Sequence, residues 1–170
     1  MSLELSVDEI VNTLKRSSLT TVLVEGKEDV LIYRWIEDEI GIINANFFPC
    51  GGRDKLLQVF ERRGEFPNLS TVFVADKDAF VYVNPPEEYN EIIWTNGYSI
   101  ENDLYHGKRI EDLMSNDEKV IFVKSLNSFI EYYACEVERF INNEKYNLVA
   151  HPQQILCEVQ HEVKQEFLDK

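Results

Sequence analysis

Thr20-Thr-Val-Leu-Val-Glu-Gly26 and Thr71-Val-Phe-Val-Ala-Asp-Lys-Asp78 are the two segments from which we predict the fold. Each begins with β-branched and apolar residues and reaches acidic residues at or near its end. Continuous apolar runs of this kind are typical of strands buried on both faces of a parallel sheet. Isoleucines then recur every four residues from Ile32 to Ile40, which predicts a helix that ends at Gly41.

The same alternation of strands and helices continues on both sides of these segments. We predict strands over residues 42–48 and 92–95, with a helix over residues 55–63 between them. Ser6-Val-Asp-Glu9 is a capping box, which predicts an earlier helix that runs to about Arg16. Strands that alternate with helices indicate parallel pairing. The expected class is therefore an α/β fold, a Rossmann-like parallel four-stranded sheet flanked by helices.

The C-terminal part of the chain reads as helical throughout, beginning near residue 116. One long amphipathic helix is indicated by Leu126, Ile130, Tyr133, Val137 and Ile141. A shorter helix after Pro152 is indicated by Leu156, Val159, Val163 and Phe167. We expect both to pack against the sheet in a single domain of residues 1–170, with an α/β core at about 18–116 and a helical C-terminal extension at about 117–170.

Composition limits the classes of function that the chain can have. Its 170 residues contain 17 Lys and Arg against 31 Asp and Glu, a net charge of −14. Such a surface repels phosphate backbones at long range, which excludes a protein that coats nucleic acid by counterion release. An enzyme that meets phosphate through bound metal is not excluded, because the metal inverts the local field. An acidic N-terminus, no apolar stretch of membrane length and three widely separated cysteines predict a cytoplasmic protein without membrane contact.

Acidic residues follow several of the predicted strands. Because ligands of open parallel sheets bind outside the carboxyl ends of the strands, Glu25, Asp76, Asp78 and Glu101 are expected at one edge. Taken singly, each has a structural explanation, since acids are common in first helical turns and in tight turns. Taken together they need a positive partner to stay ionised, and Mg²⁺ or Mn²⁺ is the hard cation that oxygen ligands prefer.

Other motifs carry weaker predictions. Gly51, Gly52 and Arg53 would let backbone amides and a guanidinium approach a phosphate, although a plain strand-to-helix turn explains them equally well. Gly26-Lys27 lacks the remaining residues of a P-loop. The three histidines have no zinc-ligand spacing, and no histidine has an evident place beside Cys50.

These motifs together resemble a known family. Val22-Leu-Val-Glu-Gly-Lys-Glu-Asp29 followed by Val72-Phe-Val-Ala-Asp-Lys-Asp78 resembles the Toprim domain of topoisomerases, bacterial primases and overcoming-lysogenization-defect nucleases. That family has one strand ending in Glu-Gly and a later one ending in Asp-x-Asp. Gly97-Tyr-Ser-Ile-Glu-Asn102 is also similar to an uncharacterised Toprim-like bacterial family encoded with, or fused to, ATPases in phage-defence loci. The resemblance covers about Leu19 to Leu104.

The resemblance implies roles for individual residues. Glu25 would be a metal ligand or general acid/base, and Asp76 and Asp78 would hold Mg²⁺. Asp29 and Glu101 correspond to the additional acids of the nuclease branch, which complete a second metal site. Two such metals clamp the attacking and leaving oxygens of a phosphodiester.

The chain departs from the family pattern in its lysines and in the loop after Asp78. The catalytic lysine of the nuclease branch has no clear match here, with Lys108 and Lys124 as candidates. Lys77, between two presumed ligands, is expected to point to solvent or substrate. Ala79 and Phe80 follow Asp78 in place of a glycine turn, so the loop geometry is expected to differ.

The leading hypothesis is a Mg²⁺- or Mn²⁺-dependent Toprim-type nuclease that cleaves DNA or RNA phosphodiester bonds. The chain lacks an ATP-binding motif, so an ATPase would be a partner chain or a further part of the protein. The alternative is a non-catalytic Toprim-like module that binds or regulates a multi-protein phage-defence complex. A phosphoacceptor domain of the receiver type is a third reading. An oligomer is compatible with all three.

Overall fold

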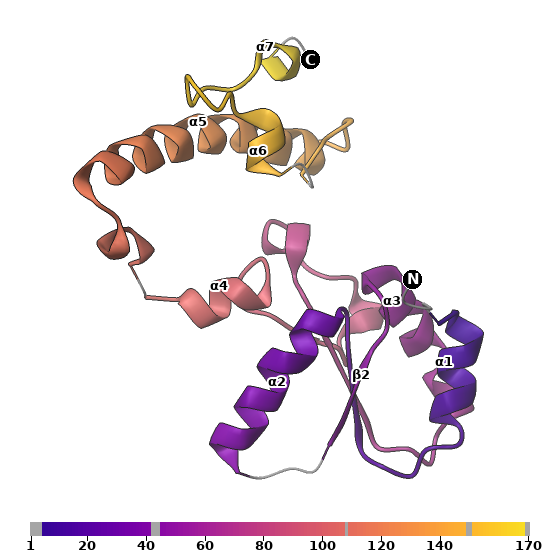
Figure 1. Cartoon of the computed structure of the whole chain (residues 1–170). Helices are drawn as coiled ribbons and strands as arrows, with labels where there is room; N and C mark the ends of the chain where they lie inside the picture. The colour runs from indigo at the N-terminus through magenta and orange to yellow at the C-terminus, as the bar shows by residue number, and fades with distance from the viewer. Residues whose placement is uncertain (1–4, 42–44, 108, 149–150, 169–170) are drawn as a thin grey trace. The chain divides into compact units, whose positions relative to one another are not determined.

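The computed structural model describes residues 5–41, 45–107, 109–148 and 151–168. The chain divides into two compact units, Met1–Leu104 and Tyr105–Lys170. The first unit contains the sheet, and the second is built from helices and turns (Figure 1). Packing of the C-terminal helices against the sheet, as one domain, stays a prediction.

The sheet has four strands, all parallel, in the order β2-β1-β3-β4. Central β1 pairs along its length with β2, so that Val24 lies beside Pro49, and β3 pairs with the short β4, so that Ala75 lies beside Trp94. This arrangement confirms the predicted α/β class. The strand predicted over residues 42–48 is observed four residues long, and residues 42–44 lie outside the described part of the chain. The strands are β1 (Thr21–Val24), β2 (Asn46–Pro49), β3 (Thr71–Ala75) and β4 (Ile93–Trp94).

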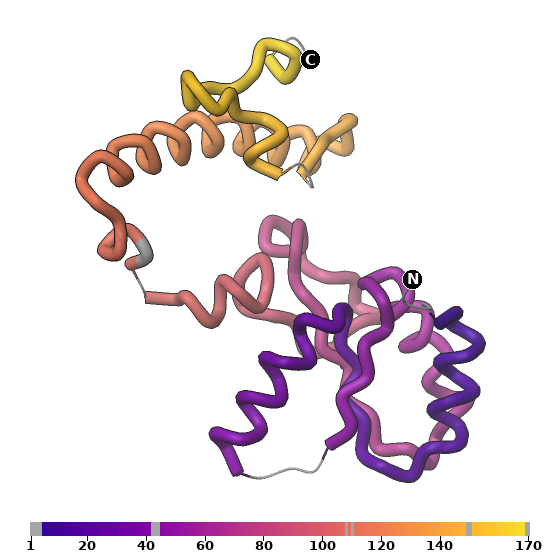
Figure 2. The backbone as a smooth tube through the Cα atoms, viewed as in Figure 1, coloured from indigo at the N-terminus to yellow at the C-terminus, as the bar shows by residue number. Residues whose placement is uncertain are grey.

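Helices cover both faces of the sheet. Figure 1 shows α2 on one side of the strands and α1 with α3 on the other, and the backbone tube of Figure 2 shows the strands passing between them. The capping box predicted at Ser6 is confirmed, because the Ser6 amide donates to the Glu9 carboxylate at 2.8 Å. The elements are α1 (Val7–Leu14), α2 (Lys27–Ile40), α3 (Arg53–Glu61), α4 (Ile100–Tyr105) and the 3₁₀ turns η1 (Arg63–Glu65), η2 (Asp78–Val81) and η3 (Glu87–Tyr89).

The core of the first unit lies between the sheet and the helices α1 and α3. Ile10 from α1, Leu23 from β1 and Leu56 from α3 are fully buried there. The ring of Phe60 meets the ring of Phe73 edge to face, with centroids 5.1 Å apart. Burying each such side chain stabilises the folded state by about 1.5–3 kcal/mol. This packing holds the strands, and therefore their ends, in place.

The second unit is dominated by α5 (Asn116–Ile141), a long continuous helix in Figure 2 that begins at the capping box of Ser115 and Glu118. The predicted helix is confirmed, but its predicted buried face is wrong. Tyr132 and Glu136 are buried, whereas Leu126 and Ile130 are exposed. Apolar residues surround the first turns of α5, so their spacing alone does not select a face. A 3₁₀ turn, η4 (Ile110–Leu113), precedes it.

The helix predicted after Pro152 is also wrong as a continuous element. Two single-turn helices, α6 (Pro152–Ile155) and α7 (Gln165–Leu168), flank an antiparallel bridge between Leu156 and Val163. His161 has a φ of 57°, and its amide donates to the Cys157 carbonyl at 2.8 Å, which closes the turn. Within the described residues, no helix is both long and apolar enough to cross a membrane.

Candidate functional site

The carboxylates that follow β1 and β3 lie together at the carboxyl edge of the sheet. The Asp76 amide donates to Glu25 Oε1 at 2.9 Å, which links the two strand ends directly. On its other side, Asp76 Oδ1 accepts the amide of Ile100 at 3.0 Å, at the start of α4. Three segments that are distant in sequence are thereby joined around Asp76.

Asp78 completes this cluster through an unusual backbone conformation. Its φ is 44°, in the left-handed region, and its amide donates to the Tyr98 carbonyl at 2.7 Å. Aspartate tolerates this region better than most residues. The sharp turn begins η2 and directs the chain away from the strand, in place of the glycine turn expected for the family.

The guanidinium of Arg53 lies among these carboxylates. Its Nη1 is 2.9 Å from Asp78 Oδ2, its Nε is 3.7 Å from Glu25 Oε1, and its Nη2 donates to the Asp76 carbonyl oxygen. Arg53 is the first residue of α3, directly after the turn that follows β2. Arg53 was expected at this edge as a phosphate ligand, and the structure places it there. Its ion pairs with Asp78 and Glu25 were not expected.

Aromatic rings enclose the other side of Arg53. The guanidinium carbon lies 5.3 Å from the ring centroid of Phe80 and 5.6 Å from that of Trp94, and these two rings meet edge to face. Within the described residues, Arg53 Nε is buried and has no hydrogen-bond partner. The rings stabilise the cation and exclude water from it.

Burial is the main influence on the protonation of the cluster. It raises the pKa of Glu25 to about 7, with further repulsion from Asp76 and Asp78, against the lowering effects of the Asp76 amide and Arg53. Burial likewise raises the pKa of Asp76 to about 6, against the lowering effect of the Ile100 amide. The pKa of Asp78 is also raised by burial, although Arg53 opposes the change. Carboxylates perturbed by burial and by each other are characteristic of functional sites.

Asp29 and Glu101, expected as ligands of a second metal, lie close enough for their charges to raise the pKa of Asp76. Asp29 Oδ2 accepts the Gly26 amide at 2.7 Å, so this side chain caps α2. Glu101 is exposed in the first turn of α4. The structural explanation of Asp29 as a capping residue thus holds alongside its place near the cluster.

The glycine turn after β2 differs from the phosphate cradle considered above. The amides of Gly51 and Gly52 both donate to the Glu25 carbonyl oxygen, each at 2.9 Å. Their φ values of 86° and 115° strongly favour glycine. Because both amides are already bonded, the turn positions Arg53 and holds the end of β1.

Cys50 directly follows β2 at this edge. The side chain is buried, and burial followed by repulsion from Glu25 raises the pKa of its thiol to about 12. A thiol with such a pKa stays protonated and unreactive at neutral pH.

Two residues that support the site were missed from the sequence. Asp103 accepts the amides of Asn96 and Gly97 at 2.9 and 2.7 Å, which fixes the loop after β4. The buried Thr95 hydroxyl accepts the amide of Lys77 at 2.9 Å and donates to the Gly97 carbonyl. Gly97 belongs to a motif noted in the sequence, but nothing in the sequence indicates that its amide donates a hydrogen bond to Asp103.

Lys77 faces a surface groove beside the cluster. Its Nζ lies 3.5 Å from the Asn96 carbonyl oxygen, in a groove of about 340 Å³. The expectation that Lys77 points to solvent or substrate agrees with this position. Lys108 lies outside the described residues, and Lys124 forms an exposed ion pair with Glu162 in the second unit. The groove is lined by Lys77, Phe80, Val81, Tyr82, Val83, Asn84, Pro85 and Asn96.

A ready-made metal centre is absent from the described residues, because no three His, Cys, Asp or Glu side chains are arranged to hold an ion. The guanidinium of Arg53 lies beside two of the carboxylates, those of Glu25 and Asp78. The donor set nevertheless fits a hard divalent cation, because Glu25, Asp76 and Asp78 present only carboxylate oxygens and are half-buried. The three side chains carry more negative charge than Arg53 neutralises.

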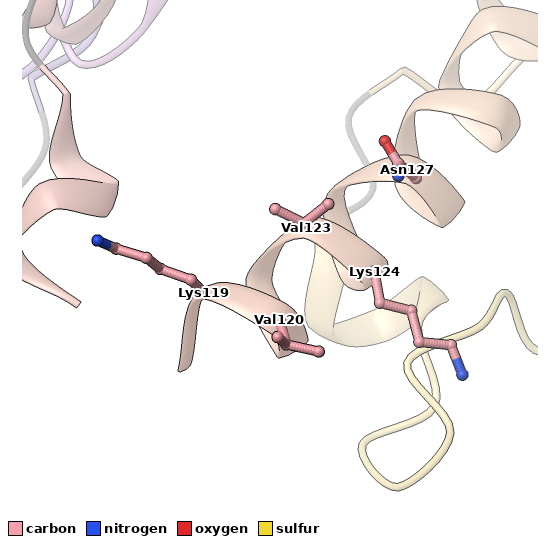
Figure 3. Close-up of a pocket in the computed structure, with 5 residues that line it drawn as sticks. All are labelled: Lys119, Val120, Val123, Lys124 and Asn127. Carbon is pink, nitrogen blue, oxygen red and sulfur yellow. The ribbon is translucent and has the colours of Figure 1, made fainter. Parts of the chain in front are cut away.

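A second surface feature lies on α5. Figure 3 shows Lys119 and Lys124 extending to either side of Val120 and Val123, with Asn127 one turn further along the helix. These five residues line a shallow pocket of about 510 Å³ without any carboxylate. Its lining combines two valines with two lysine ammonium groups and one amide.

Comparisons with known proteins add nothing to this picture. No protein-family model matches the chain, and no curated protein matches it.

Proposed function

We propose that this chain is a metal-dependent phosphoryl-transfer protein, a nuclease that cleaves DNA or RNA phosphodiester bonds with Mg²⁺ or Mn²⁺. The main observation in support is the cluster of Glu25, Asp76 and Asp78, whose half-buried carboxylates follow two adjacent strands, β1 and β3. Burial raises the pKa of all three, and repulsion between carboxylates raises those of Glu25 and Asp76 further, so a cation would stabilise their ionised forms. A divalent cation would supply that charge from oxygen ligands that it prefers.

The bound metal would polarise the phosphate and lower the pKa of attacking water. Glu25, half-buried at the end of β1, would hold the metal or act as the general acid/base. The Asp76 amide orients the Glu25 carboxylate at 2.9 Å. Lys77, at the neighbouring groove, is placed to contact the substrate backbone.

The Toprim resemblance supports the same proposal. It places Glu25, Asp76 and Asp78 at its metal-binding positions, and it adds Asp29 and Glu101 for a second ion. By the same resemblance we propose a cytoplasmic role in bacterial phage defence, with an ATPase as partner. The net charge of −14 favours local contacts with nucleic acid over long-range attraction.

The test is cleavage of labelled single- and double-stranded DNA and RNA, each with Mg²⁺ and with Mn²⁺. The double variant Glu25→Gln, Asp76→Ala removes both central ligands, and Glu28→Gln, an exposed acid of the same helix start, is the matched control. We expect metal-dependent cutting by the wild-type chain and the control and none by the double variant. Cutting that survives in the double variant would remove the site assignment.

A non-catalytic binding module is the second candidate, favoured by the exposed apolar side chains of α5. Val120, Val123 and Ile130 are each more than half exposed, which is costly without a covering partner. Sizing the chain with its genomic neighbour tests this candidate. Co-migration without cleavage by either protein would favour the module over the nuclease.

A further inference from the structure

Arg53 and a divalent cation need the same oxygens. The guanidinium approaches Asp78 Oδ2 at 2.9 Å and Glu25 Oε1 at 3.7 Å and also bonds the Asp76 carbonyl oxygen. Two cations sharing these ligands would repel each other strongly in a half-buried site. We propose that Arg53 is the resident counter-ion of the metal-free site and that a divalent cation binds by displacing its guanidinium. This inference rests on the proposed function.

The bonding of Arg53 is incomplete, which makes displacement feasible. Among the described residues, its buried Nε has no hydrogen-bond partner, because 3.7 Å to Glu25 is too long for one. A buried donor without an acceptor loses its hydration without full compensation. The ion pair therefore neutralises part of the cluster but does not satisfy all the groups that it buries.

The aromatic rings beside Arg53 bear on where a displaced guanidinium would go. The rings of Phe80 and Trp94 flank it at 5.3 and 5.6 Å, and aromatic faces attract cations. Phe80 also lines the groove that contains Lys77. A guanidinium that turns away from the carboxylates would therefore move toward this groove, with Phe80 still beside it.

The first experiment measures Mn²⁺ affinity of the full chain by calorimetry, without nucleic acid. Arg53→Gln removes the charge, and Arg63→Gln is the matched control, because Arg63 also pairs with a carboxylate, Glu91, and stacks on an aromatic ring, Phe60. We expect Arg53→Gln to bind Mn²⁺ about tenfold more tightly than wild type, because no guanidinium must be displaced. The control should bind like wild type.

The second experiment observes Arg53 directly by NMR, using the diamagnetic Mg²⁺. A guanidinium held by carboxylates rotates slowly about its Nε–Cζ bond and gives distinct Nη signals, whereas a released one averages them. We expect the Nη signals of Arg53, assigned by their loss in Arg53→Lys, to merge as Mg²⁺ is added. The signals of Arg63 should remain unchanged.

The outcomes distinguish failure of the Arg53 displacement from failure of the proposed metal-dependent function. Equal or weaker Mn²⁺ binding by Arg53→Gln, or distinct Arg53 Nη signals in Mg²⁺-saturated protein, would overturn displacement while leaving the metal site standing. Failure of every variant to bind Mn²⁺ or Mg²⁺ would overturn the proposed function and displacement together. Lower thermal stability of Arg53→Gln in EDTA supports the counter-ion role in either case, and unchanged stability contradicts it.

Discussion

Glu136 in the second unit is buried and Glu25 in the first is half-buried, and the two carboxylates are bonded in different ways. Each oxygen of Glu136 has its own partner, since Oε1 pairs with Arg139 and Oε2 accepts the Asn147 amide at 2.6 Å. Glu25 shares Arg53 with the Asp78 carboxylate and the Asp76 carbonyl oxygen, and burial raises its pKa to about 7. A carboxylate that fixes a loop is satisfied inside the chain, whereas one available for chemistry is left short of positive charge.

The largest effect that this contrast predicts is on catalysis. Asp76→Asn keeps the size of the side chain but removes a charge from the cluster, so metal-dependent cleavage should fall by at least about a hundredfold. The denaturant midpoint should stay the same or rise, because a poorly neutralised buried charge is gone. Glu136→Ala should leave the cleavage rate of the folded protein unchanged. Equal losses of cleavage in both variants would contradict the assignment of a catalytic role to Asp76 and a structural role to Glu136.

The next effect is on stability, in the other unit. Glu136→Ala leaves the Asn147 amide and the Arg139 guanidinium without their partner, which should cost about 2–3 kcal/mol of unfolding free energy. Urea unfolding followed by the far-ultraviolet helix signal measures this loss. Glu138→Ala, an exposed glutamate of the same helix, is the control and should change stability by less than about 0.5 kcal/mol. A comparable loss of unfolding free energy in both variants would mean that the buried hydrogen bonds of Glu136 do not contribute to stability.

The pH dependence of stability should sharpen the contrast further. Because the folded-state pKa of Glu25 is about 7 and its ordinary value is 4.5, the folded chain binds the proton more tightly than the unfolded chain. Its stabilising contribution is complete below about pH 4.5 and is lost as pH rises through about 7. In EDTA at pH 8, Glu25→Gln should therefore be more stable than wild type by about 2 kcal/mol, after allowance for solvent screening. Thermal melts from pH 5 to 8 test this, and an identical pH slope in both proteins would contradict it.

The smallest effect concerns a third kind of carboxylate, exposed and locally bonded. Glu118 accepts the amide and hydroxyl of Ser115 at the start of α5, and these hydrogen bonds lower its pKa. Glu118→Ala should cost about 0.5–1 kcal/mol, the usual worth of a helix cap. The same urea titrations resolve this change, and a loss as large as that of Glu136→Ala would remove burial as the distinguishing variable.

The sheet and the place of the cluster were predictable because they follow from local patterns. Apolar runs that end in Glu25 and Asp76 specify both the strands and the edge at which their acids meet. The role of Arg53 was not predictable, since its ion pairs join residues 25 or more positions apart through a turn whose geometry the sequence leaves open. The hydrogen bonds from the amides of Asn96 and Gly97 to Asp103 are local, but they too depend on a loop geometry that the sequence leaves open.

The second unit was harder to predict because its patterns are ambiguous. The spacing of apolar residues identified α5 but not its buried face, since Glu136 is buried through bonds to Arg139 and Asn147 and not through its own polarity. After Pro152, an apolar repeat was interpreted as a helix, yet Leu156 is extended and pairs with Val163. A pairing between residues in the same short segment replaces the helix here, because helices of this length are marginal by themselves.

The turn of Gly51 and Gly52 has a consequence for timing. Both of its amides are bonded to the Glu25 carbonyl oxygen, so the backbone that carries Arg53 is tethered to the backbone that carries its ion-pair partner. Displacement of the guanidinium would then need rotation of one side chain and not the loop or domain motion that takes microseconds or longer. The hydrogen bonds that join the turn to β1 would stay in place while the site loads.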